Sequence, residues 1–324
     1  MHFGAVSGSE QSEPKNSEAA FPENMMDFLE RFATEKACLA YLCKVRWPQG
    51  FVCPECAGRQ GWKTSRGTVF CGQCQKQTSP TARTILHNSR TALRKWFLAA
   101  WLLCTQKTGV SAKTLQRELK VGYKTAWLML QKLRQATIRA DRSQLTGRVE
   151  VDETFVGGQE SGVVGRQAGD KALVVIAVEL EGKKVGRVRW RLIPDASGAS
   201  LVGFLKDCVT PGTTVHTDDW NGYHGVRAAG FVHRVNVLQG DAERVRKFFP
   251  HVHLVASLLK RWLLATHQRR VEKAHLQVYL DEYAFRFNRR RSKHVGKIFY
   301  RLMEQMVLRK AKGYKEIVNP GEKD

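Results

Sequence analysis

Residues 148–195 read RVEVDETFVGGQESGVVGRQAGDKALVVIAVELEGKKVGRVRWRLIPD, and this stretch decides the fold. It holds three runs rich in Val, Ile and Phe, at 148–158, 171–180 and 186–195, and an EGK turn joins the last two. Such runs, bounded by glycine and turn residues, predict three successive strands. The pattern then predicts a helix over 198–209, strands over 213–219 and 231–238, and helices over about 253–266 and 273–288. The order β-β-β-α-β-β-α-α predicts an α/β domain.

The chain before this domain changes character several times. Residues 1–24 are rich in Ser, Glu, Asn and Gly without periodicity, which predicts a disordered lead-in. Helical spacing marks 25–47, short cysteine-paired sequence marks 51–78, and three helices with short turns are predicted from 91 to about 137. We therefore predict a lead-in (1–24), an N-terminal helix with a zinc ribbon (25–85), a helix-turn-helix region (86–142), the α/β domain (143–312) and a tail (313–324).

The charge of the chain predicts a polyanionic partner. Its 324 residues carry 53 Lys and Arg against 30 Asp and Glu, a formal net charge of +23. Nucleic acid is the first candidate and an anionic membrane the second. No apolar run approaches the ~20 residues that span a bilayer, and the N-terminus lacks the basic and apolar regions of a secretory signal. These features favour a cytoplasmic nucleic-acid-binding protein.

Two CxxC pairs predict a structural zinc site. Cys53 and Cys56 form the first pair, and Cys71 and Cys74 form the second, with fourteen residues between them. Two such pairs can place four thiolates tetrahedrally around Zn²⁺, leaving no open position for chemistry. Four unrelated buried thiols, or a redox pair, are the weaker alternatives. The other four cysteines are interpreted as buried side chains, namely Cys38, Cys43, Cys104 and Cys208.

Residues 109–137 predict a helix-turn-helix. Ser111 can cap a first helix that ends at Leu119, and a turn through residues 121–122 leads into a second helix. The residues that we expect to face the DNA groove are Tyr123, Lys124, Thr125 and Lys132. The alternative is an ordinary helical pair with a solvated basic face.

Two aspartates interrupt or end predicted strands. Asp152 lies within the first strand, and Asp218 ends the fourth. In this strand order the two strands can be neighbours, as in the ribonuclease H-like fold. Adjacent carboxylates suit a divalent cation that shares its remaining positions with water and phosphate. The alternative is that each aspartate simply ends a strand or caps a turn.

The helix predicted over 253–266 carries His253 and Lys260 seven residues apart, close to two turns, so the two side chains share a face. A metal ligand at the first position and a cation at the second could hold metal and DNA phosphate together. The alternative, which we weigh equally on these residues alone, is that His253 is a surface histidine and Lys260 a solvated lysine.

From about residue 28 to residue 291 the chain resembles the DDE-type bacterial insertion-sequence transposases, in their zinc-ribbon branch, the insertion-sequence fifteen-ninety-five family. The motifs that carry the resemblance are RWPQGFVCPEC, TSPTARTILHNSRTALRKWFLAAWL, VEVDETFVGG, HTDDWNGY, SLLKRWLLATH and HLQVYLDEYAFRFNRRR, in that order. The resemblance implies a ribonuclease H-like catalytic domain with a mixed five-stranded sheet. It also implies Mg²⁺-dependent hydrolysis at the element ends, followed by strand transfer from the freed 3′-hydroxyl.

The resemblance also assigns roles to residues. Asp152 and Asp218 match the first two catalytic acids, and Lys260 matches a basic position downstream of the third. The family's usual Glu in the third position, eight residues before an Arg, is His253 in this chain. A neutral imidazole can bind a divalent metal but adds no negative charge, so Mn²⁺ could be favoured over Mg²⁺. Asp219, in place of the usual Gly, could restore some charge, and weaker candidates for the third role are His251, Asp281 and Glu282.

The basic run FRFNRRRSK at 285–293 follows the catalytic helices. We interpret Arg289, Arg290 and Arg291 as contacts to DNA phosphates, against the alternative of a solvated helix end. The sequence thus predicts a transposase that binds double-stranded DNA, forms a homo-oligomer on it, has no membrane association, and works in the bacterial cytoplasm at the nucleoid. A transposase that has lost catalysis and only binds DNA is the rival hypothesis. A zinc-ribbon transcription factor would leave the acid-bearing sheet unexplained.

Overall fold

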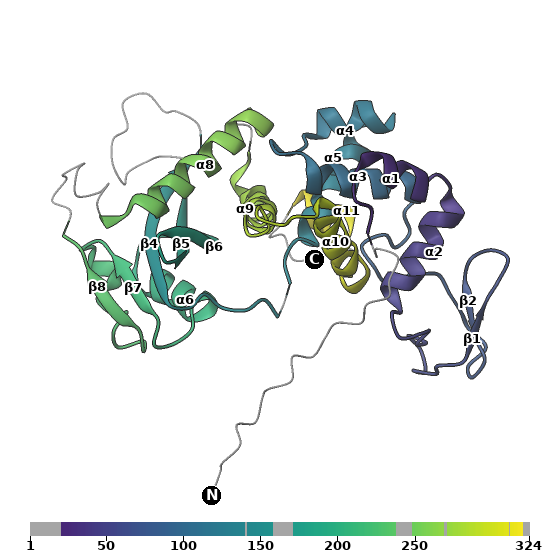
Figure 1. The fold of residues 1–324 in the computed structure, drawn as a ribbon, viewed down its shortest axis with the longest axis horizontal. Helices are drawn as coiled ribbons and strands as arrows, with labels where there is room; N and C mark the ends of the chain where they lie inside the picture. Colours follow the sequence, from purple (N-terminus) through teal and green to yellow (C-terminus); the bar gives the residue numbers. More distant parts are fainter. Residues whose placement is uncertain are drawn as a thin grey trace, which may run out of the picture.

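The computed structural model describes residues 21–139, 141–157, 171–237, 248–268, 271–310 and 312–319. Figure 1 shows an α/β part with its sheet on the left and a helical part with a small ribbon on the right, and α9 and α10 lie between them. Most of the predicted lead-in and the end of the predicted tail fall outside the described residues. Within the described ranges, no helix combines the length and the apolar character needed to cross a bilayer.

The helical part and the ribbon comprise α1 (Met25–Arg31), α2 (Glu35–Arg46), β1 (Gly61–Lys63), β2 (Val69–Cys71), β3 (Gln77–Thr78), α3 (Leu93–Thr105), α4 (Ala112–Leu119) and α5 (Tyr123–Gln135). The remaining elements are β4 (Arg148–Val156), β5 (Ala172–Glu181), β6 (Lys184–Ile193), α6 (Gly198–Cys208), β7 (Thr214–Thr217), η1 (Asn221–Tyr223), β8 (Val232–Val235), α8 (Pro250–His267), α9 (Lys273–Phe287), α10 (Val295–Leu308) and α11 (Tyr314–Val318).

The larger sheet is mixed and has five strands in the order β6-β5-β4-β7-β8. β4, β5 and β6 form an antiparallel meander, while β4 pairs with β7, and β7 with β8, in parallel. The five strands that the sequence predicts in this domain are confirmed, with tighter ends. The expectation that the first and fourth of them are neighbours is also confirmed.

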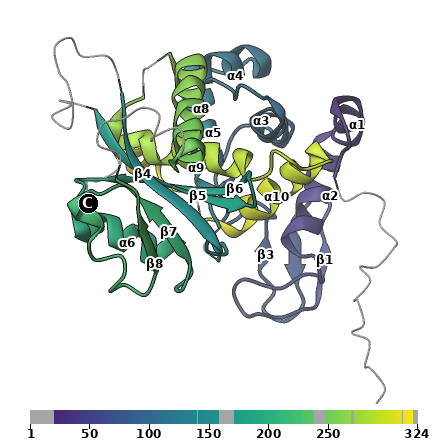
Figure 2. The same cartoon turned by 60° about the vertical axis from the view of Figure 1, so that its left-hand side comes forward.

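Helices cover both faces of this sheet. In β5 the alternate residues Val174, Ile176 and Val178 pack with α8 and α9, whereas Val175 and Ala177 pack with α6. Side chains of a strand point alternately to its two sides, so an almost wholly apolar strand must be buried on both faces. Figure 2 shows α8 and α6 on opposite sides of the sheet.

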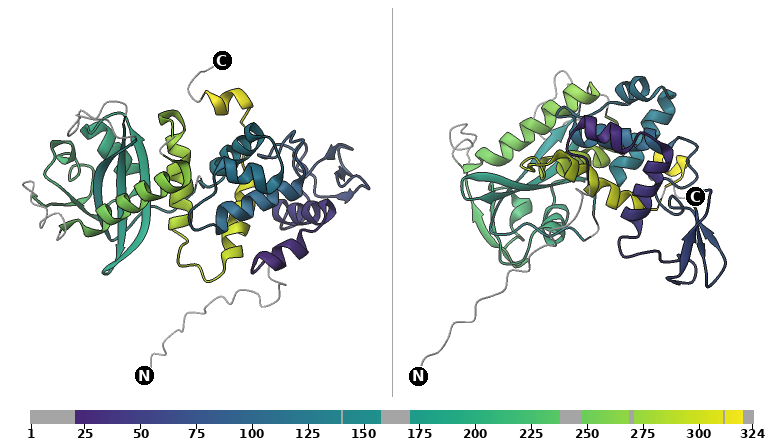
Figure 3. Two further views of the ribbon diagram at one scale, coloured as in Figure 1. Left: turned by 90° about the horizontal axis from the view of Figure 1, so that it is seen from above. Right: turned by 45° about the vertical axis from the view of Figure 1, so that its right-hand side comes forward.

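The helical part is built around one core that joins distant segments of the chain. Phe28 of α1 stacks on Trp101 of α3 with ring centroids 4.8 Å apart, and Phe299 of α10 contacts both rings. Helix α10 packs against α2 and α3, as Figure 3 shows. The predicted division assigns α10 to the α/β domain, but its apolar face lies in the core of the helical part.

Helices α4 and α5 form the predicted helical pair. The Ser111 hydroxyl accepts the N–H of Thr114 at 3.1 Å, as its predicted capping role requires. Lys120 follows α4 in the left-handed conformation (φ 48°), and Gly122 directly precedes α5. The turn therefore falls where the sequence places it, and it leaves the first residues of α5 exposed.

A buried ion pair ties the helical part to the α/β part. The Arg134 guanidinium of α5 donates to the Glu282 carboxylate of α9 at 2.7 Å, and both side chains are almost completely buried. The same guanidinium lies over the Tyr279 ring, 4.1 Å from its centroid. Removing either partner of such a pair leaves a buried charge uncompensated, so the pair constrains how α5 sits on α9.

Candidate functional site

The four predicted zinc ligands lie together. The Sγ atoms of Cys53 and Cys74 are 3.6 Å apart, as are those of Cys56 and Cys71, and all four lie within 4.8 Å of one another. Thiolates held tetrahedrally at the ~2.3 Å Zn–S distance are separated by about 3.8 Å, so the cluster has the dimensions of a structural zinc site.

The two CxxC turns repeat the same backbone geometry. The N–H of the residue after each second cysteine, Ala57 or Gln75, donates to the carbonyl of the first cysteine, at 2.9 and 3.0 Å. Both residues have a positive φ, near 60°. Backbone N–H groups of Cys74 and Gln73 also lower the pKa of Cys71 to about 7, although burial opposes them, which favours the thiolate that binds metal.

Asp152 lies within β4, and Asp218 immediately follows β7, the parallel neighbour of β4. The pairing of β4 with β7 runs from Arg148–Thr214 to Glu150–His216. Asp152 and Asp218 each lie two residues beyond the last paired residues, Glu150 and His216. The two aspartates therefore lie at one edge of the sheet, where the pairing of β4 with β7 ends.

Helix α8 brings His253 and Lys260 to Asp152. The His253 Nδ1 lies 3.7 Å from the Asp152 Oδ2, too far for a hydrogen bond but within the span of two ligands to one ion, about 4.2 Å for bond lengths of ~2.1 Å. Burial lowers the pKa of His253; the Glu150 carboxylate opposes this and the Lys260 ammonium adds to it. The imidazole is therefore neutral at neutral pH, the state in which it can bind a metal.

The side chain of Lys260 is half-buried, and burial lowers its pKa, while the Asp152 carboxylate opposes that shift and Lys171 adds to it. The charges of Asp152 and Lys171 thus both act on Lys260 at this edge of the sheet. Among the described residues, however, the four cysteines are the only group of three or more His, Cys, Asp or Glu whose ligand atoms lie within 4.8 Å of one another. Asp152, Asp218 and His253 therefore do not form a closed ligand set.

Glu150, which the sequence analysis did not single out, anchors α8. Its fully buried carboxylate accepts the N–H groups of His251 and Val252 at 3.2 and 3.0 Å and the His251 ring at 2.8 Å. Helix α8 has no cap from its own N-terminal residues, so a strand supplies the acceptor that its first turn needs. The available signal was its spacing, because Glu150 lies two residues before Asp152 and shares its face of the strand.

Tyr223 is a second residue that the sequence analysis missed. Its buried hydroxyl donates to the Glu153 carboxylate at 2.8 Å. Burial raises its pKa well above the usual value, and the charges of Glu153, Asp152 and Asp218 add to the effect. A neutral phenol therefore lies within the influence of both predicted catalytic aspartates and holds Glu153 of the strand that carries Asp152.

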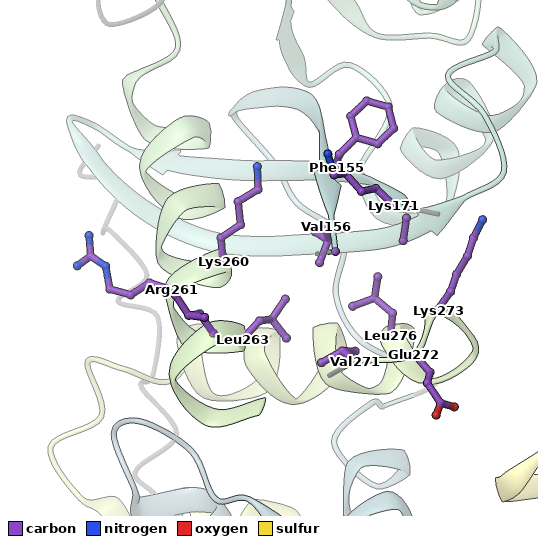
Figure 4. A pocket seen from close by; sticks show the side chains of 13 residues that line it. Phe155, Val156, Lys171, Lys260, Arg261, Leu263, Val271, Glu272, Lys273 and Leu276 are labelled. Atoms are coloured by element: carbon purple, nitrogen blue, oxygen red, sulfur yellow. The ribbon is translucent and has the colours of Figure 1, made fainter. Parts of the chain in front are cut away.

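A hollow of about 960 Å³ adjoins this edge (Figure 4). Apolar side chains of α8, of α9 and of the segment before α9 line it, among them Leu263, Leu276 and Val271, and Lys260 and Lys171 are also lining residues. The hollow thus combines an apolar surface with positive charge beside Asp152.

The predicted DNA-facing residues of α5 differ in exposure. Tyr123 is 52% exposed and Lys124 is also exposed, at the first turn of the helix. Thr125 and Lys132, two turns apart on one face, are half-buried, and burial lowers the pKa of Lys132. The helix therefore offers its N-terminal end to a partner while its C-terminal half packs on α9.

The three predicted arginines after α9 have different surroundings. Arg290 donates to the carbonyls of Gly186 and Val185, and Arg291 donates to Val185 and pairs with Glu181 at 2.6 Å. Arg289 instead lies over the Phe285 ring, 4.1 Å from its centroid. Two of the three thus fasten the β5–β6 hairpin.

Comparison with known families matches two segments of the chain. Residues 144–288 match the ISXO2-like transposase domain, and residues 33–77 match the transposase zinc-ribbon domain, which includes all four clustered cysteines. Both domains are those of the IS1595 transposases.

The chain belongs to the IS1595 family of transposases.

A relative supports this membership. An uncharacterized protein in transposable element ISH50 of Halobacterium salinarum is 28% identical over 285 residues, covering 80% of this chain and 92% of that protein. The family resemblance expected from the sequence is therefore confirmed, and the mixed sheet with helices agrees with a DDE transposase domain.

Within this transposase the weaker candidates for the third catalytic position have other partners. His251 is held by Glu150, and Glu282 by Arg134. Asp281 accepts from the Gln277 amide at 3.1 Å within α9. Asp219 is exposed next to Asp218. His253 is thus the α8 side chain that meets Asp152.

We expect Glu150→Gln to lower the free energy of unfolding by about 1–3 kcal/mol, because the amide carries no charge and points a donor at N–H groups that need an acceptor. Urea denaturation followed by circular dichroism measures this. Glu181→Gln, which breaks only an exposed pair with Arg291, is the control and should change stability little. Equal stability of the two variants would contradict the anchoring role of Glu150.

We expect purified protein to hold one zinc ion per chain, measured by elemental analysis, and Cys56→Ser to hold none, because a structural site needs all four thiolates. The control is Cys43→Ala, which alters a buried cysteine outside the cluster. Full zinc content in Cys56→Ser would show that the cluster does not hold the ion.

Proposed function

We propose that this protein binds the terminal inverted repeats of its own insertion element and catalyses metal-dependent DNA cleavage and strand transfer. The observation that carries the proposal is the contact of α8 with the sheet edge, where His253 and Lys260 lie near Asp152 and Asp218 follows the neighbouring strand. Two acids, a metal-binding imidazole and a cation are the groups that phosphodiester chemistry needs in one place.

A catalytic Mg²⁺ or Mn²⁺ would be held by Asp152, Asp218 and His253. When bound, it supplies an activated water and stabilises the leaving oxygen of the phosphodiester. The donor types suit such an ion, since a neutral imidazole stands 3.7 Å from one of two carboxylates. The ligand atoms of the three side chains do not all lie within 4.8 Å of one another, so binding would have to draw Asp218 toward the other two. With one nitrogen ligand among them, this set favours Mn²⁺ over Mg²⁺.

The protein's own side chains would position the DNA strand. Lys260 and Lys171 carry positive charge in the lining of the hollow beside Asp152, where a phosphate at the cleavage point would lie. The exposed first turn of α5, with Tyr123 and Lys124, would enter the major groove as the second helix of a helix-turn-helix. Arg289, Arg290 and Arg291 would add phosphate contacts, of which the last two also hold the hairpin.

We infer a ribonuclease H-like fold for the catalytic part. The neighbouring first and fourth strands, and the helix between the third and fourth, support it. Cutting two ends of one element calls for at least two active sites, so we also infer a homo-oligomer on DNA, acting in the bacterial cytoplasm at the nucleoid.

The histidine at the third catalytic position favours one rival hypothesis, a protein that binds DNA without cleaving it. His253 replaces the usual acid of the family, and a transposase-derived protein that binds DNA without cutting it would tolerate that change. The two hypotheses differ in a cleavage assay, because only the rival requires a restored acid for any activity.

We expect Asp152→Ala to abolish nicking of labelled element-end DNA while leaving end binding intact, because it removes a metal ligand and leaves the DNA-contacting helices unchanged. Gel analysis of nicking with Mg²⁺ or Mn²⁺, beside a mobility-shift assay, measures both. The control Asp207→Asn loses only an exposed pair with Arg191 and should cleave normally. Undiminished nicking by Asp152→Ala would overturn the assignment.

We expect His253→Ala to lower Mn²⁺-dependent nicking by about 10–100-fold, the scale on which a disturbed ligand shell acts, and His253→Glu to shift the preference toward Mg²⁺. His87→Ala, an exposed histidine of the ribbon region, is the control. No nicking by the unaltered protein with either ion, together with robust nicking by His253→Glu, would establish the rival.

A further inference from the structure

A second pocket, of about 440 Å³, lies where the segment after α5 joins the sheet. Its walls come from residues 137–139 and 141–143, from β6, and from the C-terminal end of α9 with the two residues that follow it. The lining is rich in positive charge, with five arginines and only two carboxyl groups. The arginines are Arg139, Arg142, Arg187, Arg189 and Arg289, and the carboxyl groups are those of Asp141 and Asp281. No residue of the catalytic edge is among its lining residues.

Two of the five guanidinium groups are already neutralised. Arg187 pairs with the buried Glu179 carboxylate at 2.6 Å, and Arg139 pairs with Asp141 at 2.7 Å. The remaining three, Arg142, Arg189 and Arg289, make no ion pair with a carboxylate in the described part of the chain.

Arg189 is the most informative of the three. It is 5% exposed, its Nη atoms donate to the carbonyls of Val188 and Ser143, and its Nε has no hydrogen-bond partner among the described residues. Burial lowers its pKa to about 10, and the charges of Arg142 and Arg187 contribute, so it remains a cation at neutral pH. The Glu179 carboxylate acts on Arg189 but is already paired with Arg187, so among the described residues this buried cation has no counter-charge of its own, and a bound anion would supply one.

Arg142 and Arg289, the other two of these three cations, line the same pocket. Arg142 is exposed at the mouth and makes no hydrogen bond or ion pair within the described ranges. Arg289 is held flat on the Phe285 ring and by a 3.0 Å bond to the Phe285 carbonyl. The Asp281 carboxyl is buried, and burial raises its pKa to about 7, so its opposing charge is reduced.

We propose that this pocket binds a phosphate group of the DNA backbone, through Arg142, Arg189 and Arg289. Guanidinium groups match the oxygen geometry of phosphate, and a phosphodiester supplies the single negative charge that Arg189 lacks. This deepens the proposed function and rests on it for the source of the phosphate. Because the pocket joins the segment after α5 to β6, a phosphate held there fixes the helix-turn-helix region against the catalytic sheet.

The first experiment uses inorganic phosphate alone, titrated into the full-length protein by calorimetry at constant ionic strength. We expect saturable binding that Arg142→Gln weakens about tenfold or more, since a hydrogen bond to a charged group is lost. Arg142 is exposed and unpaired within the described ranges, so its replacement leaves the fold intact. The control is Arg191→Gln, which lies outside the pocket on the same strand as Arg189 and should bind phosphate normally.

The second experiment identifies the source of the phosphate. We expect Arg142→Gln to reduce the slope of log K against log salt for duplex DNA by about one, and Arg191→Gln to leave it unchanged. An altered slope supports the DNA backbone as the source. Phosphate binding that depends on Arg142 with an unaltered slope would instead assign the site to a free phosphate and overturn the DNA contact.

Equal phosphate binding and equal salt slopes in Arg142→Gln and the unaltered protein would overturn the site altogether. Neither experiment depends on cleavage. A protein that never nicks DNA, but loses phosphate in Arg142→Gln, would fail the proposed catalytic function and keep this pocket.

Discussion

The hydrogen bonds between the Glu150 carboxylate and the first turn of α8 hold this helix against the sheet edge that carries Asp152, and the arrangement of the candidate site depends on them. A helix begins with N–H groups that its own backbone cannot satisfy, and its N-terminus attracts negative charge. Glu150 meets both needs from inside the sheet, at 3.0–3.2 Å from two backbone nitrogens. Since Asp152 lies two residues away on the same face, the bond that fixes α8 also fixes the distance from His253 to Asp152.

The same device recurs where the helical part is assembled. The Glu35 carboxylate of α2 accepts the N–H groups of Leu93 and Arg94, both at 2.8 Å, and so caps α3, which has no side-chain cap of its own. With the buried pair of Arg134 and Glu282, three carboxylates each join segments distant in sequence. Some of the 30 acidic residues thus hold the fold together, and the 53 Lys and Arg residues outnumber them. The excess cations remain for the surface and for sites such as the pocket lined by Arg142, Arg189 and Arg289.

The parts of this molecule that the sequence predicts are those encoded by local pattern. Apolar runs predict the five strands, spacing predicts the cysteine cluster, and Ser111 with Gly122 predicts the limits of α4 and α5. What the pattern misses depends on contacts across long separations. Glu150 looks like any charged residue in a strand until α8 arrives 100 residues later. Nor does any local signal place α10 in the core of the helical part, because its apolar stripe would suit either core.

Under the proposed function, the buried Glu150 also bears on why a histidine could serve at the third catalytic position. Glu150 adds negative charge near His253, which raises the pKa of that imidazole against the larger effect of burial. Its oxygens are hydrogen-bonded to α8, so Glu150 does not compete with Asp152 for an ion. An acid at position 253 would place a third carboxylate near Asp152 and Glu150, and repulsion among them would need a metal to offset it. A neutral imidazole removes that repulsion, so α8 can dock on the sheet before any metal binds. The cost falls on the affinity for hard cations, since a nitrogen ligand without charge holds Mg²⁺ poorly. If His253 holds the proposed catalytic ion, stable docking of α8 and strong Mg²⁺ binding are competing demands, and the histidine favours the first.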